Sequence, residues 1–177
     1  PPSNPSKRAL SMAELTELLQ QLRATLGKME LALNSISDAI VWVDGKEGKV
    51  QWSNMAFCHL VGKPYLEALG AELTALLPFE HEGRPLSPVE HPVNRLLSTE
   101  AALHELYQLR TASQLFTLEV SGARAEPEEL GVTIVLVVRD VTGREQAADA
   151  LRRKKEEVER INHFMIDREG RILELKR

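Results

Sequence analysis

The junction between an apolar strand and a charged helix constrains the fold of this chain more than any other feature. Residues 132–138 (VTIVLVV) are apolar almost throughout and predict a buried strand. After residues 139–142 (RDVT), only Gly143 intervenes before a charged run with helical periodicity. A globular unit joined this closely to a helix can pass a rotation or a shift from one to the other. The pattern therefore favours a sensor or relay module over a self-contained enzyme.

Composition limits the classes of protein to which the chain can belong. Its 177 residues suffice for one domain with extensions, and 43% apolar with 27% charged residues is ordinary for a soluble protein. No apolar stretch approaches the roughly 18 residues of a membrane span, so we expect no membrane contact. The net charge of −4 gives no sign of nucleic-acid binding. A single cysteine, Cys58, excludes an internal disulfide and suits a reducing cytoplasm, where we expect the protein to reside.

Both ends of the sequence suggest a piece of a longer protein. Residues 1–10 are rich in proline and serine and predict a linker. The chain lacks an initial methionine, and it ends at Arg177 within a helical pattern. We therefore expect further segments on either side.

An amphipathic helix is predicted over residues 11–34. Ser11 and Glu14 have the spacing of a capping box at its start. Apolar residues then recur at intervals of three and four, and the stripe is wider than that of a bare coiled coil. The helix could pack on its own domain or on a second copy of the chain, and both can hold together. The candidate dimer contacts in it are Leu15, Leu18, Leu22 and Met29.

Alternating and apolar segments predict an α+β domain. Two predicted strands flank an Asp44-Gly45 turn. Short helical segments separated by prolines come next, and three more strands follow. The predicted strands are residues 39–43, 49–53, 104–109, 114–123 and 132–139. Hairpin connections indicate an antiparallel sheet with the helices collected on one face.

Four stretches of the sequence, taken together, resemble the PAS sensor domains of bacterial signalling proteins. The stretches are DAIVWVD (38–44), VQWSNMAF (50–57), PLSPVEHP (85–92) and VRDVT (138–142). The last is similar to the Asp-Ile-Thr signature with which these domains end, with valine in place of isoleucine. The resemblance covers residues 35–142. It implies the PAS fold, a five-stranded antiparallel sheet in the order 2-1-5-4-3 with short helices on one face around a ligand pocket.

Residues 143–177 predict a long helix with a coiled-coil seam. Leu151, Val158 and Met165 recur every seven residues, and Ile161 fills a complementary position. Lys154 interrupts the seam, which suits a connector that can switch. The segment resembles the signalling helices that join PAS domains to kinase, cyclase or response-regulator partners. An ordinary solvated helix is the alternative.

No catalytic constellation is visible in the sequence. There is no glycine-rich phosphate loop, and the five histidines lack the spacing of a metal site. Some PAS domains hold haem through a histidine near the place of His91, but the following Pro92 disfavours a helical, pocket-facing geometry for it. Cys58 precedes the place of the reactive cysteine in flavin-binding relatives. We therefore expect no enzymatic activity in this segment, no metal and no cofactor.

The predicted interior is aliphatic. Strand alternation turns one set of side chains inward as a candidate apolar pocket, which would hold a small apolar ligand or be a plain packed core. These residues are Val41, Val43, Phe57, Leu60, Ile134, Leu136 and Val138. The opposite face of the sheet carries Trp42, and the N-terminal helix is the nearest segment that could cover it.

These observations predict a PAS sensory and dimerisation module of a cytoplasmic signal-transduction protein, relaying its signal through the C-terminal helix to an output kinase or cyclase domain. Asp140, Val141 and Thr142 would form the relay, with Asp140 paired to a neighbouring arginine and Thr142 capping the helix. The homodimer would be formed by the candidate contacts of helix 11–34 together with further apolar residues. These are Trp42, Leu151, Val158, Ile161 and Met165. The alternatives are a structural spacer that senses nothing, a haem or flavin sensor, and an enzyme.

Overall fold

The computed structural model describes residues 11–99, 101–126 and 131–174, and the side chains of the last helix as far as Met165. The predicted linker at residues 1–10 and the predicted helix end at residues 175–177 lie outside the described residues. Within the described part, the helices are α1 (Met12–Asn34), α2 (Met55–Val61), α3 (Tyr65–Ala68), α4 (Leu73–Leu76), α5 (Pro92–Ser98) and α6 (Thr142–Glu174). The strands are β1 (Ala39–Asp44), β2 (Val50–Ser53), β3 (Phe79–His81), β4 (Arg84–Pro85), β5 (Leu103–Arg110), β6 (Leu115–Ala125) and β7 (Thr133–Asp140).

All of these strands form one antiparallel sheet in the order β2-β1-β7-β6-β5-β3-β4. The α+β class is confirmed, but the predicted count of five strands and the predicted order are wrong. Two short strands extend the sheet beyond β5, because Phe79 pairs with Leu109 and β4 then folds back on β3. Pro78 precedes this hairpin and Pro85 is its last residue, and its strands are too short to show a period-two pattern in the sequence.

Local signals in the sequence explain where the first two helices begin and end. The capping box predicted for α1 is confirmed, since Ser11 Oγ accepts from the Glu14 N–H and the Glu14 carboxylate accepts from the Ser11 N–H. Asn54 caps α2 through its side chain and accepts from the Phe57 N–H. Gly62 ends α2 with a φ of 67°, a left-handed conformation that glycine adopts without strain.

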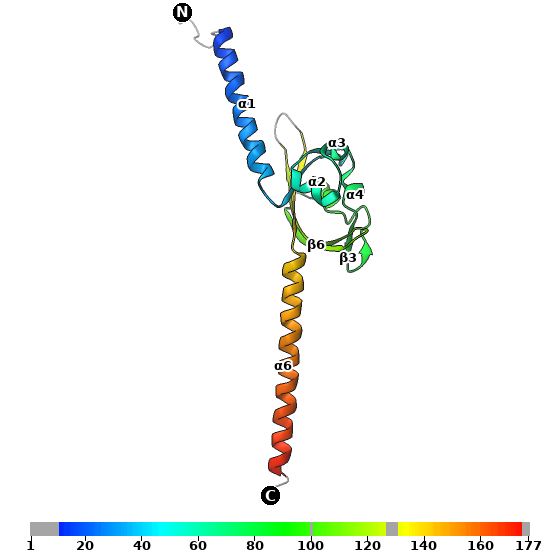
Figure 1. Cartoon of the computed structure of the whole chain (residues 1–177). Coiled ribbons are helices and arrows are strands. Elements are labelled where there is room, and N and C mark those ends of the chain that lie inside the picture. Colours follow the sequence, from blue (N-terminus) through cyan, green and yellow to red (C-terminus); the bar gives the residue numbers. More distant parts are fainter. Residues whose placement is uncertain (1–10, 100, 127–130, 175–177) are drawn as a thin grey trace, which may run out of the picture.

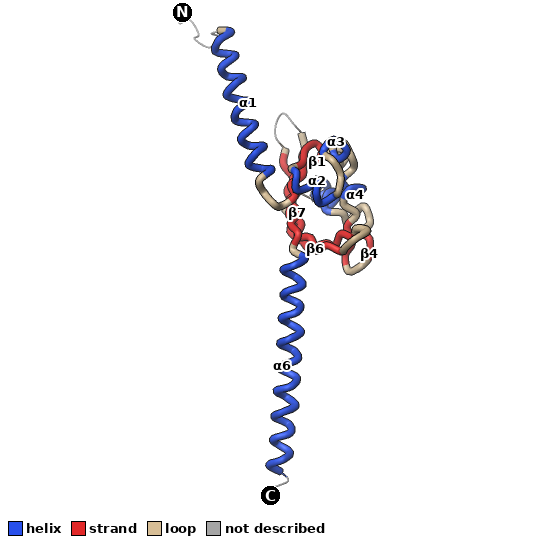
Figure 2. Tube along the Cα trace, viewed as in Figure 1, coloured by secondary structure: helices blue, strands red, loops and turns tan. Residues whose placement is uncertain are grey.

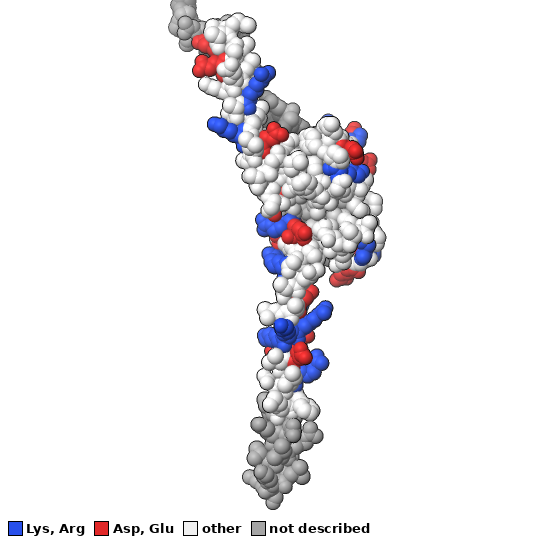
Figure 3. Space-filling model, in the orientation of Figure 1, with Lys and Arg blue, Asp and Glu red and all other residues white. Residues whose placement is uncertain are grey.

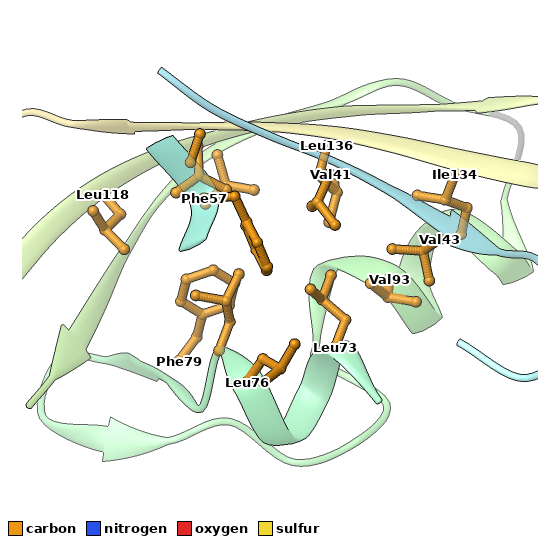
Figure 4. Packing of buried hydrophobic residues seen from close by; sticks show 14 of the residues in the cluster. Val41, Val43, Phe57, Leu73, Leu76, Phe79, Val93, Leu118, Ile134 and Leu136 are labelled. Carbon is orange, nitrogen blue, oxygen red and sulfur yellow. The ribbon is translucent and has the colours of Figure 1, made fainter. Parts of the chain in front are cut away.

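The core lies between the inner face of the sheet and helices α2 to α5. Side chains from β1 and β7 meet those of the helical segments there, as Figure 4 shows for Val41, Leu136 and Phe57. Each of these three residues is fully buried. Gly122 in β6 has no room for a side chain, because a Cβ at this position would collide with the side chains of Leu136 and of Leu96 in α5.

The two long helices extend to opposite sides of the domain (Figures 1 and 2), although both join it at the same end of the sheet. This follows from the antiparallel register, which places Ala39 at the start of β1 beside Val138 near the end of β7. Helix α1 buries no residue and extends away from the sheet. The expectation that α1 covers the outer face of its own sheet is therefore wrong for a single copy, and Trp42 remains 37% exposed.

Candidate signal-relay site

The predicted relay residues form the junction between the sheet and α6. Asp140 ends β7, and Thr142 is the first residue of α6. Between them, the buried Val141 donates its N–H to the carbonyl of Thr117 in β6, at 2.9 Å. The Thr142 hydroxyl oxygen accepts from the N–H of the same Thr117, also at 2.9 Å. Helix α6 therefore begins while bonded to the neighbouring strand, with no flexible segment between.

Asp140 caps the first turn of α6. Its Oδ1 accepts from the Thr142 N–H at 2.9 Å and from the Thr142 hydroxyl at 2.5 Å. Asp140, and not Thr142 as expected, therefore supplies the capping acceptor, because the first amides of a helix need an acceptor and its carboxylate lies directly before them. The neighbouring arginines pair with other carboxylates instead, Arg139 with Asp38 and Arg144 with Glu119.

At the other junction, Asn54 binds the end of α1 to the domain. Its side chain is fully buried and uses both atoms of the amide. The Oδ1 atom accepts from the N–H groups of Ile40 and Phe57, whereas Nδ2 donates to the carbonyls of Leu33 and Asp38. One side chain thus joins α1, β1 and α2. The sequence indicated only its capping role, since two of its partners precede it by 16 and 21 residues.

The candidate pocket residues lie in the packed core. Leu60 is partly buried and the other six of the set are at most 1% exposed. In Figure 4, Val41, Val43, Ile134 and Leu136 from the sheet point toward Phe57 and other helical side chains. These side chains contribute no hydrogen-bonding group, so the interior suits apolar contacts alone.

A separate cleft of about 500 Å³ opens between the β1–β2 turn, α4 and the start of α5. None of the candidate pocket residues lines it. Its floor includes Phe79 and Val93, and its rim includes Glu47 and Glu72. His91 also lines it, stacked on Phe79 with ring centroids 5.4 Å apart.

Both ring nitrogens of His91 are engaged in hydrogen bonds. Nε2 donates to the Leu77 carbonyl at 3.0 Å, so Nδ1 is the nitrogen that accepts from the Val93 N–H. Burial lowers the pKa of His91, and the bond to Leu77 opposes this shift. The imidazole is therefore a neutral structural group at the start of α5.

A polar cluster beyond the cleft fixes α5 against β5. Arg95 donates two hydrogen bonds to the Glu105 carboxylate and one to the Tyr107 hydroxyl, which itself donates to Glu105. The Arg95 bonds lower the pKa of Glu105 to about 2, and burial raises the pKa of Tyr107 to about 12. The three side chains of this cluster thus bond to one another. Within the described residues, no group of three His, Cys, Asp or Glu side chains could hold a metal ion.

The family of the chain is decided by comparison of its sequence with known families. The sequence pattern described as PAS fold matches residues 33–146, well over half of the chain. The chain belongs to the PAS family. No curated protein matches the sequence.

Solved structures of PAS domains share the fold of this PAS domain at low sequence identity. The PAS domain of an HTR-like protein from Haloarcula marismortui is 19% identical with a TM-score of 0.57, over 71% of this chain and 98% of that chain. The PAS domain of nitrogen regulation protein NR(II) from Vibrio parahaemolyticus is 13% identical with a TM-score of 0.51, over 63% and 95%. A PAS domain from a two-component sensor histidine kinase is 14% identical with a TM-score of 0.51, over 67% and 97%.

The candidate dimer contacts of this PAS domain are exposed in a single copy. In α1, the residues Leu15, Leu18, Leu22 and Met29 are between 44% and 56% exposed. In α6, the residues Leu151, Val158, Ile161 and Met165 are more than half exposed. On the sheet, Trp42 packs on Trp52 with ring centroids 5.1 Å apart and faces outward with it. No described helix is long and apolar enough to cross a membrane.

Proposed function

We propose that this PAS domain is a sensory and dimerisation module of a cytoplasmic signal-transduction protein, which relays a ligand or partner signal through α6 to an output domain. The observation that carries the proposal is the bonding of Val141 and Thr142 to Thr117. A displacement of β6 or β7 moves the first turn of α6 directly. A helix of 33 residues then carries this movement roughly 50 Å from the sheet.

The proposed function includes a homodimer, in which the α6 helices of two chains pair and a signal shifts or rotates one relative to the other. The exposed apolar stripes of α1 and α6 are two unpaired surfaces on one chain. A symmetric pair of chains brings each stripe to its own copy and removes apolar area from water. The exposed Trp42 and the partly buried Trp52 on which it packs offer a third contact.

The output domain in this proposal is a kinase or cyclase domain that follows α6. The name of one PAS relative, a two-component sensor histidine kinase, favours a kinase. The test is the parent protein with Asp140→Ala or Thr142→Ala. Each variant should change signal output while its circular dichroism spectrum and cooperative unfolding remain those of a folded domain. Normal signalling by both variants would contradict the relay.

A structural spacer that senses nothing is the second candidate. The close packing of the candidate pocket residues favours it, since the core leaves these side chains in contact with one another. Native mass spectrometry of freshly purified protein separates the two functions. A retained small molecule supports the sensor, and a mass equal to that of the chain alone supports the spacer.

A haem or flavin sensor fits the residues poorly. The two nitrogens of His91 already bond to Leu77 and Val93, so the ring would have to break one bond to ligate iron. Cys58 is buried in α2, with its Sγ 3.7 Å from Ser53 Oγ, and does not line the cleft. We propose no cofactor and no catalytic role for this segment.

A further inference from the structure

Four charged side chains form a continuous row where α1 and α6 leave the domain. We call Asp38, Arg139, Glu119 and Arg144 the charged row. Charged side chains of both signs are visible at this place in Figure 3. Arg139 donates to Asp38 from Nε at 3.0 and 3.1 Å and from Nη2 at 2.6 Å. Its Nη1 lies 3.6 Å from Glu119, and Nη2 of Arg144 lies 3.6 Å from the other oxygen of Glu119.

The sheet register explains why these residues meet. Glu119 in β6 lies directly opposite Arg139 in β7. Asp38 immediately precedes β1, whose first residue pairs with the residue before Arg139. Arg144 reaches back from the first turn of α6. The charged row therefore crosses three neighbouring strands on the outer face and ends on the outgoing helix.

Each inner member of the charged row is shared between two partners. Arg139 divides three nitrogens between Asp38 and Glu119, and Glu119 divides two oxygens between Arg139 and Arg144. An Arg139 released from Asp38 can turn more of its guanidinium to Glu119, where it competes with Arg144. A change at Asp38 thus alters the ion pair between Glu119 and Arg144, which binds the first turn of α6 to the sheet. His104 also faces Glu119, with Nε2 at 3.7 Å.

Asp38 is also bound to α1 through Asn54. The Asn54 amide donates to the carbonyls of Asp38 and Leu33, the latter in the last turn of α1. Met55 adds a bond to Asn34 at the end of the helix, with its N–H 2.9 Å from Asn34 Oδ1. A tilt or rotation of α1 therefore displaces Asp38 against Arg139.

We propose that the charged row couples α1 to α6 directly, so that the domain transmits an input arriving along α1 without a ligand in the core. This rests on the proposed function only in taking α6 as the output helix. The input can be any event that tilts or rotates α1, including its pairing with a second copy or with another helix. The domain would then act as a connector between two helices in addition to any sensing by its interior.

The test is hydrogen–deuterium exchange of the whole chain, read at the Glu145 amide, which donates to Val141 in the first turn of α6. Asp38→Asn should raise the exchange rate of this amide by about threefold, the scale of an exposed ion pair. In an Arg139→Gln background, Asp38→Asn should have no further effect on it. An equal effect of Asp38→Asn with and without Arg139 would overturn the proposal, because the row would then not carry the change.

Glu80→Gln is the matched control. The Glu80 side chain is 14% exposed and pairs with the exposed Arg110, just as the Asp38 side chain is 17% exposed and pairs with the exposed Arg139. It lies on β3, away from both helices, so its loss should leave the Glu145 rate unchanged. A rise equal to that of Asp38→Asn would show general destabilisation and would also overturn the proposal.

The salt dependence of the same exchange rate gives a second measurement, in the wild-type chain and in Arg139→Gln. At 1 M salt the screening length falls to about 3 Å, so the Glu145 rate should rise more in the wild-type chain than in Arg139→Gln, which keeps the Arg144–Glu119 contact but has lost the ion pairs of Arg139. An equal response of both chains would contradict the coupling. Monomeric protein in sedimentation would instead remove the dimer of the proposed function and leave this coupling intact, so the two failures are distinguishable.

Discussion

The hydroxyl oxygen of Thr142 accepts a hydrogen bond of 2.9 Å from the backbone N–H of Thr117. The first residue of the outgoing helix is thereby bonded to a strand that precedes it by 25 residues. Because Val141 bonds to the carbonyl of the same residue, both backbone groups of Thr117 are occupied by the junction. The junction is thus part of the sheet's hydrogen-bond network.

Removing this hydroxyl should loosen the helix from the sheet. Thr142→Val keeps the shape of the side chain but leaves the Thr117 N–H without its acceptor, which we expect to lower the free energy of unfolding by about 1–2 kcal/mol. Urea denaturation measures the loss. Thr142→Ser retains the hydroxyl and is the control, and equal losses in both variants would contradict the role of this bond.

Substitution of Asn54 should destabilise the fold more than substitution of most other polar residues. Asn54→Ala deletes four hydrogen bonds at a fully buried site, and we expect it to lower the free energy of unfolding by about 3 kcal/mol. Asn54→Asp retains the two acceptor bonds but loses both donors. It should therefore release the last turn of α1, detected as faster amide exchange at Ser35, whose N–H bonds back into α1. Unchanged exchange there would show that Asn54 does not hold α1.

Much of the fold follows from signals within the sequence. The caps at Ser11 and Asn54, the end of α2 at Gly62 and the five longer segments of β structure lie close to their predicted places. The hairpin of β3 and β4 was not predictable, because its three- and two-residue strands exist only through pairing with β5.

The contacts between residues far apart in the chain could not be predicted from the sequence either. Asp38 and Arg139 are separated by 101 positions, and periodicity indicates which face a side chain occupies but not its partner. Residues 140–142 lie between the last strand and the long helix, as predicted, and their role as a relay stays a prediction. The capping role of Asp140 was not predictable, because the hydroxyl oxygen of Thr142 accepts from the N–H of Thr117, which lies 25 residues earlier in the chain.

His91 should make stability depend on pH. Its pKa is lowered in the folded protein, so below the ordinary value of about 6.5 the unfolded chain binds more protons than the folded one. The contribution of His91 to the free energy of unfolding is therefore present above that pH and is lost as the pH falls below it. Between pH 7 and 5, the wild-type chain should lose stability relative to His91→Gln by up to about 1.4 kcal/mol per pH unit. Parallel urea-denaturation curves for both chains would contradict this.

Gly122 should tolerate no larger side chain. Gly122→Ala places a Cβ against Leu136 and Leu96, and we expect the overpacking to cost about 1–3 kcal/mol in thermal or urea unfolding. Gly143→Ala is the control, because nothing lies within 4 Å of a Cβ there and the position is helical. It should be neutral or stabilise by about 0.5 kcal/mol. A stable Gly122→Ala would mean that the α5–β6 contact is looser than described.

The proposed dimer should depend on the apolar face of α6. Ile161→Lys places a charge on the predicted seam, and we expect it to raise the dimer dissociation constant at least about tenfold, or 1.4 kcal/mol, in sedimentation equilibrium. Glu156→Gln changes the net charge by the same amount on the opposite face and should have little effect. Monomeric wild-type protein at tens of micromolar would contradict the dimer itself.

The most direct measurement of the central claim, that sheet and helix form one mechanical unit, is amide exchange in the wild-type chain across the junction. The amides of Val141 and Glu145 should exchange within about tenfold of the Leu136 amide in the centre of β7, as members of one cooperative unit. Exchange of Val141 and Glu145 at the rate of an unstructured peptide, with Leu136 still protected, would contradict it.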